Sequence, residues 1–159
     1  MALPETMDGL KSCELFRLLN EGEMQVLLSL LGDACELNEY KGGDHIFDQG
    51  ELSSKLYVIV EGQVLLQRSV DIGSKKAALP LGLLGKGRAM GWSATLYGPR
   101  YSTASAICQK PSQVIAIDGT HLRVVLEKQP RIGFKVMDSL ACMLGERLKA
   151  AYNTMEAHL

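Results

Sequence analysis

Closely spaced glycines between short apolar runs constrain this chain more than any other feature, because they limit its middle part to short strands. From Cys35 onward the helical spacing of apolar residues gives way to alternation, and turn signals follow at short intervals. These glycines are Gly42, Gly43, Gly50, Gly62, Gly73, Gly82, Gly85, Gly87 and Gly98. Many short strands with frequent glycine turns are typical of a β-sandwich or barrel. We therefore predict such a structure over residues 35–118.

The clearest strand is predicted at Lys55–Val60, where almost every residue is β-branched or aromatic. Glu61–Gly62 then turns the chain into the apolar run Val64–Leu66, which predicts a central hairpin. Two later segments, Ser102–Cys108 and Gln113–Ile117, complete the predicted strands.

Helical patterns stand on both sides of the strands. Before them, Leu15 and Leu18 recur at helical spacing, and Asn20 followed by Glu23 resembles a capping box that opens an apolar run. After them, Asp118 is placed to cap a helix, and Pro130 suits the first turn of a last one. We expect N-terminal helices at 1–34 and C-terminal helices at 119–159. A chain of 159 residues, 47% of them hydrophobic, suits a single domain.

The last predicted helix carries one long apolar stripe. Its members step by three or four residues: Ile132, Val136, Leu140, Met143, Leu144, Leu148, Tyr152, Met155 and Leu159. Such a stripe is long for packing on one small domain. Either it covers the strands along its whole length, or its second half pairs with the same helix of another copy, which predicts a homodimer.

Several segments of the chain share one pattern of glycines. Asp44–Glu51 leads into Leu56–Val64, and Leu84–Gly87 and Met90–Gly91 lead to Pro99–Ala106. These segments resemble the cyclic-nucleotide-binding domain family, which includes catabolite activator protein and the regulatory subunit of protein kinase A. The first pair is similar to the family's glycine-punctuated first half, and Pro99–Ala106 looks like its phosphate-binding cassette. The resemblance covers nearly the whole chain. It implies an α+β fold: an antiparallel, jelly-roll-like β-roll with short N-terminal helices and a long C-terminal helix.

The same resemblance assigns the candidate binding residues. A short helical turn after Gly91 is expected to present free amides from Ser93 to Thr95, and the Arg100 guanidinium supplies a planar, charged fork for phosphate oxygens. Hydroxyl groups of the following residues add possible hydrogen bonds. The predicted ligand-binding residues are Gly91, Trp92, Ser93, Ala94, Arg100, Tyr101, Ser102 and Thr103.

Trp92 departs from the family pattern. It stands where cyclic-AMP binders usually have a glutamate that accepts from the ribose 2′-hydroxyl, and the cassette is one residue shorter between Gly98 and Arg100. Losing a charged hydrogen bond of about 1.5–3 kcal/mol weakens binding roughly 10- to 100-fold. Trp92 either stacks on a base or fills the pocket as a packed indole.

Other classes of function lack their sequence signals. The net charge is −1 and no basic cluster exceeds Lys75–Lys76, so we expect no direct contact with nucleic acid or membrane. No window approaches eighteen apolar residues and the first residues do not resemble a secretory signal, which predicts a cytoplasmic protein. No catalytic motif is present, and the histidines and four cysteines lack metal-ligand spacing, so we expect neither an enzyme nor a metal site.

Two functions remain open. The first is a regulatory module that binds a small phosphate-bearing ligand, such as cyclic AMP or cyclic GMP, in the roll and signals through the C-terminal helix to a partner protein. The alternative is a degenerate roll that binds no nucleotide and serves protein interaction or dimerisation. A cavity filled by apolar side chains beside Arg100 favours the second function, and an open polar cavity favours the first.

Overall fold

The protein is described by a computed structural model that covers residues 4–159; the first three residues of the expected N-terminal helical segment lie outside the described part. Two helices and two 3-10 turns come first: α1 (Pro4–Lys11), η1 (Glu14–Phe16), α2 (Glu21–Leu31) and η2 (Gly32–Ala34). Eight strands follow: β1 (Cys35–Tyr40), β2 (His45–Phe47), β3 (Lys55–Glu61), β4 (Val64–Ile72), β5 (Lys75–Leu84), β6 (Ala89–Met90), β7 (Ser105–Cys108) and β8 (Ser112–Asp118). The 3-10 turn η3 (Trp92–Thr95) lies between β6 and β7, and α3 (Gly119–Lys128) and α4 (Pro130–Ala157) end the chain.

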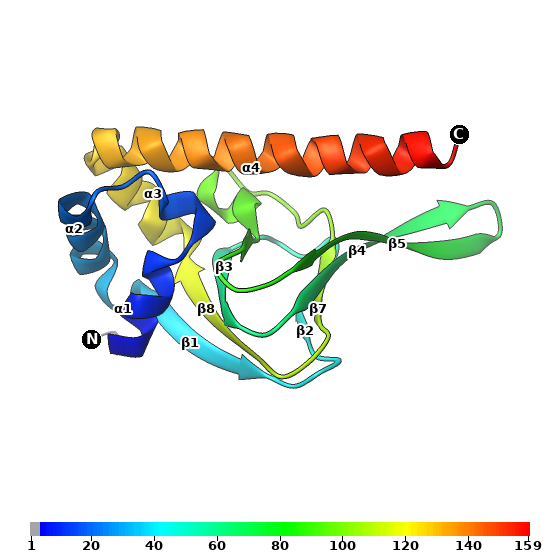
Figure 1. The fold of residues 1–159 in the computed structure, drawn as a ribbon, viewed down its shortest axis with the longest axis horizontal. Coiled ribbons are helices and arrows are strands. Elements are labelled where there is room, and N and C mark those ends of the chain that lie inside the picture. The colour runs from blue at the N-terminus through cyan, green and yellow to red at the C-terminus, as the bar shows by residue number, and fades with distance from the viewer. Residues whose placement is uncertain (1–3) are drawn as a thin grey trace.

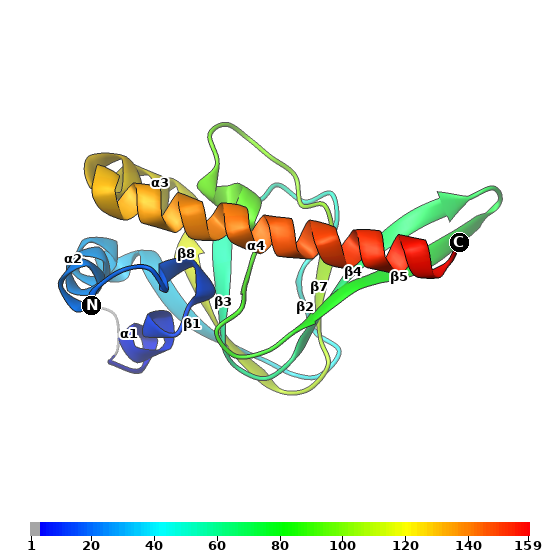
Figure 2. The same ribbon diagram turned by 45° about the horizontal axis from the view of Figure 1, so that its top comes forward.

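The strands form two antiparallel sheets of four strands each, in the orders β1-β8-β3-β6 and β2-β7-β4-β5. The predicted α+β roll is thus confirmed. Figure 1 shows α4 lying along one side of the roll, from the end that carries α2 and α3 toward the protruding β4–β5 hairpin. In Figure 2 the same helix crosses in front of the strands.

The predicted central hairpin at Glu61–Gly62 is wrong. The turn is present, but β3 pairs with β6 and β8 whereas β4 pairs with β5 and β7, so the turn carries the chain from one sheet to the other. Gly62 has φ +113°, and a Cβ there would stand 2.1 Å from the hydroxyl oxygen of Ser112. Glycine is therefore required at this corner, since both the conformation and the close approach exclude a side chain.

Two other local predictions differ from the structure. Gly82 does not form a turn: it lies inside β5 and pairs with Leu66, next to a bulge at which Leu81 has no partner on β4. The strand expected at Ser102–Cys108 begins only at Ser105, because the backbone of Ser102 instead pairs with the loop residues Gly50 and Glu51.

The helix starts follow the sequence signals. Asn20 and Glu23 form the predicted capping box, with the side chain of each accepting the backbone N–H of the other. Asp118 caps α3 by accepting the N–H of His121. The helical spacing of Leu15 and Leu18, by contrast, does not produce an α-helix, because only the 3-10 turn η1 forms there and Leu18 lies beyond its end.

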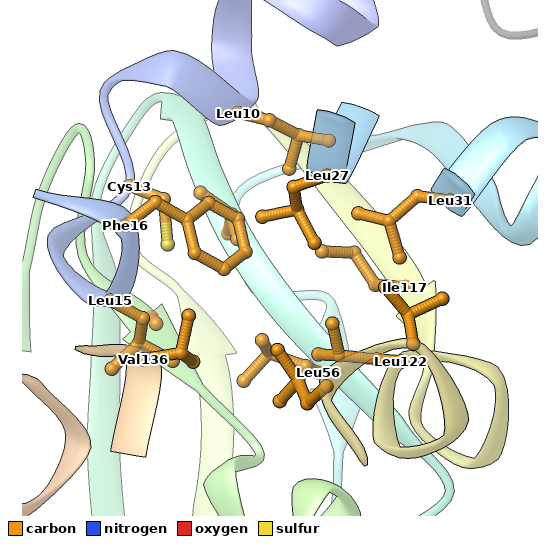
Figure 3. Close-up of a cluster of buried hydrophobic side chains, with 14 of the residues drawn as sticks. Leu10, Cys13, Leu15, Phe16, Leu27, Leu31, Leu56, Ile117, Leu122 and Val136 are labelled. Carbon is orange, nitrogen blue, oxygen red and sulfur yellow. The ribbon is translucent and has the colours of Figure 1, made fainter. Parts of the chain in front are cut away.

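The largest core cluster lies where the N-terminal helices, α3 and the first half of α4 meet the outer face of the sheet that contains β3 and β8 (Figure 3). Phe16, Leu27 and Leu122 meet there and are almost fully buried. Each side chain of this size contributes about 1.5–3 kcal/mol when it is removed from water. A second cluster fills the interior of the roll and contains no residue of α4. Since the buried residues that α4 adds to the main cluster lie between Ile132 and Met143, the core anchors only the first half of that helix.

Candidate functional site

A cavity of about 800 Å³ lies between the roll and the second half of α4. Its lining residues come from three places: the interior of the roll, the strand β5, and α4. From the rest of the roll and η3 come Phe47, Leu66, Arg88, Met90, Gly91, Trp92, Ser93, Ser102, Thr103 and Ala104; from β5, Leu79, Pro80, Leu81, Gly82, Leu83 and Leu84; and from α4, Leu144, Glu146, Arg147, Leu148, Ala150, Ala151, Thr154, Met155 and, after its end, His158. A molecule bound here touches both the roll and the C-terminal helix.

Five of the eight predicted binding residues line this cavity: Gly91, Trp92, Ser93, Ser102 and Thr103. They come from two neighbouring segments of the chain, the start of η3 and the stretch before β7, which the fold brings to one wall. Within residues 4–159 the hydroxyl groups of the two serines and the threonine make no hydrogen bond. The wall therefore offers three hydroxyl groups to a ligand.

Gly91 allows the wall to form. It has a left-handed backbone with φ +74°, and a Cβ there would stand 2.6 Å from the carbonyl oxygen of Lys55. Only glycine combines that conformation with such a close approach. The chain can then turn directly from β6 into η3, which places Trp92 and Ser93 at the cavity.

The amides of η3 are less available than the sequence predicted. The N–H of Ala94 donates to the carbonyl oxygen of Gly91 over 3.1 Å, so it is not free for a phosphate. Ala94 also does not line the cavity; its carbonyl oxygen faces the start of α3, where a Cβ added at Gly119 would stand 2.4 Å away. A 3-10 turn uses each amide one residue earlier than an α-helix does, which leaves fewer free donors.

Arg100 and Tyr101 lie outside the cavity. The Arg100 side chain is exposed and makes no hydrogen bond or ion pair within the described residues, while its carbonyl oxygen accepts the N–H of Ser53. Tyr101 is 64% exposed and forms an isolated bridge with Leu52. The two residues hold the edge of a loop, and their role in binding stays a prediction.

Trp92 lines the cavity and is partly buried against the main core cluster. Its carbonyl oxygen accepts the hydroxyl of Thr95 over 2.7 Å, which fixes the backbone of η3. Its indole N–H has no hydrogen-bond partner within residues 4–159. The indole thus forms part of the wall and leaves space beside it.

Apolar side chains form most of the remaining wall. Phe47 stacks on Tyr57 with ring centroids 5.5 Å apart, and burial raises the pKa of the Tyr57 hydroxyl. Leu83, Leu148 and Met155 stand on opposite sides of the cavity and stay more than half exposed. The cavity is therefore open to solvent between β5 and α4, and its lining suits an apolar body.

Two arginines that the motif comparison did not single out also line the cavity. Arg88 precedes β6, and Arg147 comes from α4. Burial lowers the pKa of the Arg147 guanidinium, and the nearby Glu14 carboxylate opposes that effect. A signal for Arg147 was present in the sequence, because it lies on the apolar stripe between Leu144 and Leu148, where a charge is unexpected.

Within the described residues no group of three or more histidine, cysteine or acidic side chains is placed to hold a metal ion. In the same part of the chain no helix is both long enough and apolar enough to cross a membrane.

The model of the cyclic nucleotide-binding domain family matches residues 37–129, which is more than half of the chain, so the chain belongs to this family. It is 30% identical over 123 residues to a cAMP-dependent protein kinase regulatory subunit of Mycosarcoma maydis, covering 77% of this chain and 21% of that protein. It is 32% identical over 92 residues to the cGMP-dependent protein kinase egl-4 of Caenorhabditis briggsae, covering 57% of this chain and 12% of that protein. The chain thus spans about a fifth or less of these two relatives.

A solved cyclic nucleotide-binding domain from Methylobacillus flagellatus shares the fold, with a TM-score of 0.76 and 20% identity. The match covers 98% of this chain and 83% of that structure. Both the roll and the long final helix therefore belong to the shared architecture.

Proposed function

We propose that this chain is a regulatory module that binds a cyclic nucleotide or a similar phosphate-bearing ligand in the cavity. The observation that carries the proposal is the double wall of that cavity. One side contains Gly91, Ser93 and Thr103 from the roll, and the other is the second half of α4. A ligand that touches both sides favours the position of α4 in which it binds more tightly. The shift in the equilibrium between positions of α4 is set by the ligand's difference in affinity for them.

The names of the two protein relatives support cyclic AMP and cyclic GMP as the first ligands to test. With Trp92 in place of a ribose-binding carboxylate, we expect weak binding of either nucleotide, or a preference for a ligand whose flat body stacks on the indole. Neither nucleotide acts as a reagent in this proposal, since the module senses its ligand and is not an enzyme.

We further propose that α4 delivers the signal. Its second half keeps Leu148, Tyr152 and Met155 more than half exposed, which favours pairing with the same helix of a second copy or with a regulated partner protein.

The four cysteines of the chain are all unpaired, which is consistent with the reducing cytoplasm. The near-neutral charge gives no reason to expect direct contact with nucleic acid.

A thermal-shift titration with cyclic AMP, cyclic GMP and cyclic di-GMP tests the ligand proposal. A ligand at a hundred times its dissociation constant stabilises the folded state by about 2.7 kcal/mol. Ala151→Trp places an indole in the cavity and should abolish the shift, whereas Ala141→Trp lies on the same helix away from the cavity and should keep it. Arg100→Ala tests the cassette prediction separately. If no nucleotide shifts the wild-type protein, the ligand proposal fails.

Sedimentation tests the homodimer. We expect a dimer at micromolar concentration that dissociates in the double variant Leu148→Glu, Tyr152→Glu. Phe134→Glu is a matched control, because Phe134 is also an exposed apolar residue of α4 but lies in its first half. A wild-type protein that sediments only as a monomer contradicts the homodimer.

The second candidate function, a degenerate roll that acts only in protein interaction, is favoured by one observation. The charged side chain of Arg100 does not line the cavity, and much of the lining is apolar. This function predicts no thermal shift with any of the three nucleotides together with a dimer that still forms.

A further inference from the structure

Three charged side chains from distant parts of the chain meet at the cavity. Glu14 comes from η1, Arg88 from the turn before β6, and Arg147 from α4. One oxygen of Glu14, Oε2, accepts Nε of Arg88 over 3.1 Å and the backbone N–H of Ala89 over 2.6 Å, and it lies 3.6 Å from Nη2 of Arg147. The side chains of Glu14 and Arg147 are only 17% and 20% exposed.

The charges and hydrogen bonds of this cluster are not balanced. Two guanidinium groups share one carboxylate oxygen. Nη2 of Arg147 also donates to the carbonyl oxygen of Ala89 over 2.5 Å, but Nε of Arg147 is buried without a hydrogen-bond partner. Because a buried donor without a partner is costly, and more so when it is charged, the cluster lacks an acceptor.

The cavity borders this cluster. Arg88 and Arg147 both line it, whereas Glu14 does not, so an acceptor that enters the cavity meets the two guanidinium groups and not the carboxylate. Among the described residues the only carboxylate in the lining is Glu146, whose side chain is exposed and makes no ion pair. Arg100, the arginine expected to hold phosphate, is absent from the lining.

We propose that Arg88 and Arg147 form the binding site for an oxyanion, a phosphate or carboxylate group of the molecule that occupies the cavity. The inference rests on the proposed ligand-binding function and names the residues that recognise the charged part of the ligand. Guanidinium groups suit this role because their planar N–H forks match oxyanions in pairs. A bound oxyanion adds an acceptor for Arg88 and Arg147, which it shares with the Glu14 oxygen, and that oxygen keeps its bond to the N–H of Ala89.

This arrangement also links binding to α4. Arg147 is a residue of α4, and Arg88 precedes β6 of the roll, so an oxyanion between them joins the helix to the roll. The ligand body then lies between Trp92 and the apolar residues of β5 and α4.

Isothermal titration calorimetry of the full chain at constant ionic strength tests the site, with cyclic AMP, cyclic GMP, cyclic di-GMP and inorganic pyrophosphate as probes. Arg147→Met removes the guanidinium and keeps an apolar stem, and we expect it to weaken binding roughly 10- to 100-fold. Lys149→Met removes a cation two residues further along the same helix, outside the lining, and should leave affinity unchanged. Glu14→Gln removes the competing charge but retains an acceptor for Ala89, so it should strengthen binding.

Each outcome decides between the inference and the proposed function. Nucleotide binding that falls in Arg147→Met but not in Lys149→Met supports both. Nucleotide binding that is equal in wild type and Arg147→Met, or that falls equally in both variants, overturns the oxyanion site and leaves the ligand-binding function standing. Pyrophosphate binding that depends on Arg147, without binding of any nucleotide, supports the site and overturns nucleotide sensing. No binding of any probe overturns both.

The test does not depend on one variant. If circular dichroism shows that Arg147→Met is unfolded, Arg147→Lys and Glu14→Gln take its place. Lysine keeps the charge but not the planar fork, so weaker binding in Arg147→Lys together with tighter binding in Glu14→Gln supports the site, and unchanged affinity in both overturns it.

Discussion

The two halves of α4 carry the same apolar repeat but have opposite surroundings. In the first half Ile132, Val136, Leu140 and Met143 are buried, at 4% exposed or less, whereas in the second half Leu148, Tyr152 and Met155 are 52% to 64% exposed. The first half packs against η1 and α3, and the second half lies over the cavity. Apolar periodicity therefore shows which face of a helix avoids water, but not what covers that face.

The difference has a physical basis in what holds each half. Lys135 in the first half donates to Glu23 of α2 over 2.6 Å, and Arg131 lies 3.7 Å from the same carboxylate. Among the described residues, the second half has one polar contact with the roll, through Arg147. We expect the first half to act as an anchor for the second, which a ligand or partner can reposition.

Leu140→Ala should give the largest loss of stability, about 2–5 kcal/mol, because it leaves a cavity in the main core cluster. Leu148→Ala removes the same atoms from the exposed half and should cost far less. Urea denaturation of the two variants measures both values. Equal losses would show that the two halves are buried alike and would contradict the comparison.

Glu23→Gln should weaken the anchor in a pH-dependent way. The hydrogen bond from Lys135, followed by the backbone N–H of Asn20, lowers the pKa of the Glu23 carboxyl below its ordinary value of 4.5. Its contribution is therefore present above pH 4.5 and is lost as the pH falls through the lower pKa of the folded state.

Urea midpoints of wild type and Glu23→Gln should thus differ at about pH 7, and the difference should shrink as the pH falls through the lowered pKa of the folded state. Glu21→Gln is the matched control, since Glu21 lies in the same helical turn and has no ion pair within the described residues. A difference between Glu23→Gln and wild type that stays constant with pH would exclude the ion pair as its cause.

Ser139→Ala should stabilise the protein, by about 1 kcal/mol, because the Ser139 hydroxyl is buried in the first half of α4 without a hydrogen-bond partner. Alanine also favours the helix slightly more than serine does. Thermal unfolding measures the change. A lower unfolding temperature would show that the hydroxyl makes a hydrogen bond that the structure does not contain.

Tyr152→Ala should have the smallest effect on the stability of the monomer, within about 0.5 kcal/mol, because the side chain is half exposed in the second half of α4. The measurement is urea denaturation at a concentration where sedimentation shows a monomer. At higher concentration the wild type should gain stability over the variant if the proposed dimer forms. A large loss of stability in the monomer would show that the Tyr152 side chain packs against another part of the same chain.

Much of the fold followed from local sequence signals. The capping box at Asn20 and Glu23, the cap at Asp118 and the strand at Lys55 each depend on residues close together in the chain, and each is present. The hairpin at Glu61–Gly62 was predicted wrongly because the sequence of a turn specifies its bend but not the sheet that the next strand joins. That choice depends on β5 and β7, which pair with β4.

The site followed the same rule. Motif resemblance pointed to the two segments of one cavity wall, in which Gly91 and Ser102 lie. It could not give the direction in which Arg100 points, nor bring Arg147 from α4 to Arg88. The hydrogen bond from Arg147 to Ala89 joins residues 58 positions apart, so it depends on how the helix lies across the roll, and no local pattern contains that information.

The sequence by itself determined several elements: the capped starts of α2 and α3, the strand at Lys55, and which face of α4 avoids water. These properties come from backbone conformation and short-range hydrogen bonds, which adjacent residues decide. Only the tertiary structure decided which half of α4 is buried and which arginines face the cavity. Both depend on packing between distant segments, where the position of one helix sets the surroundings of every side chain along it.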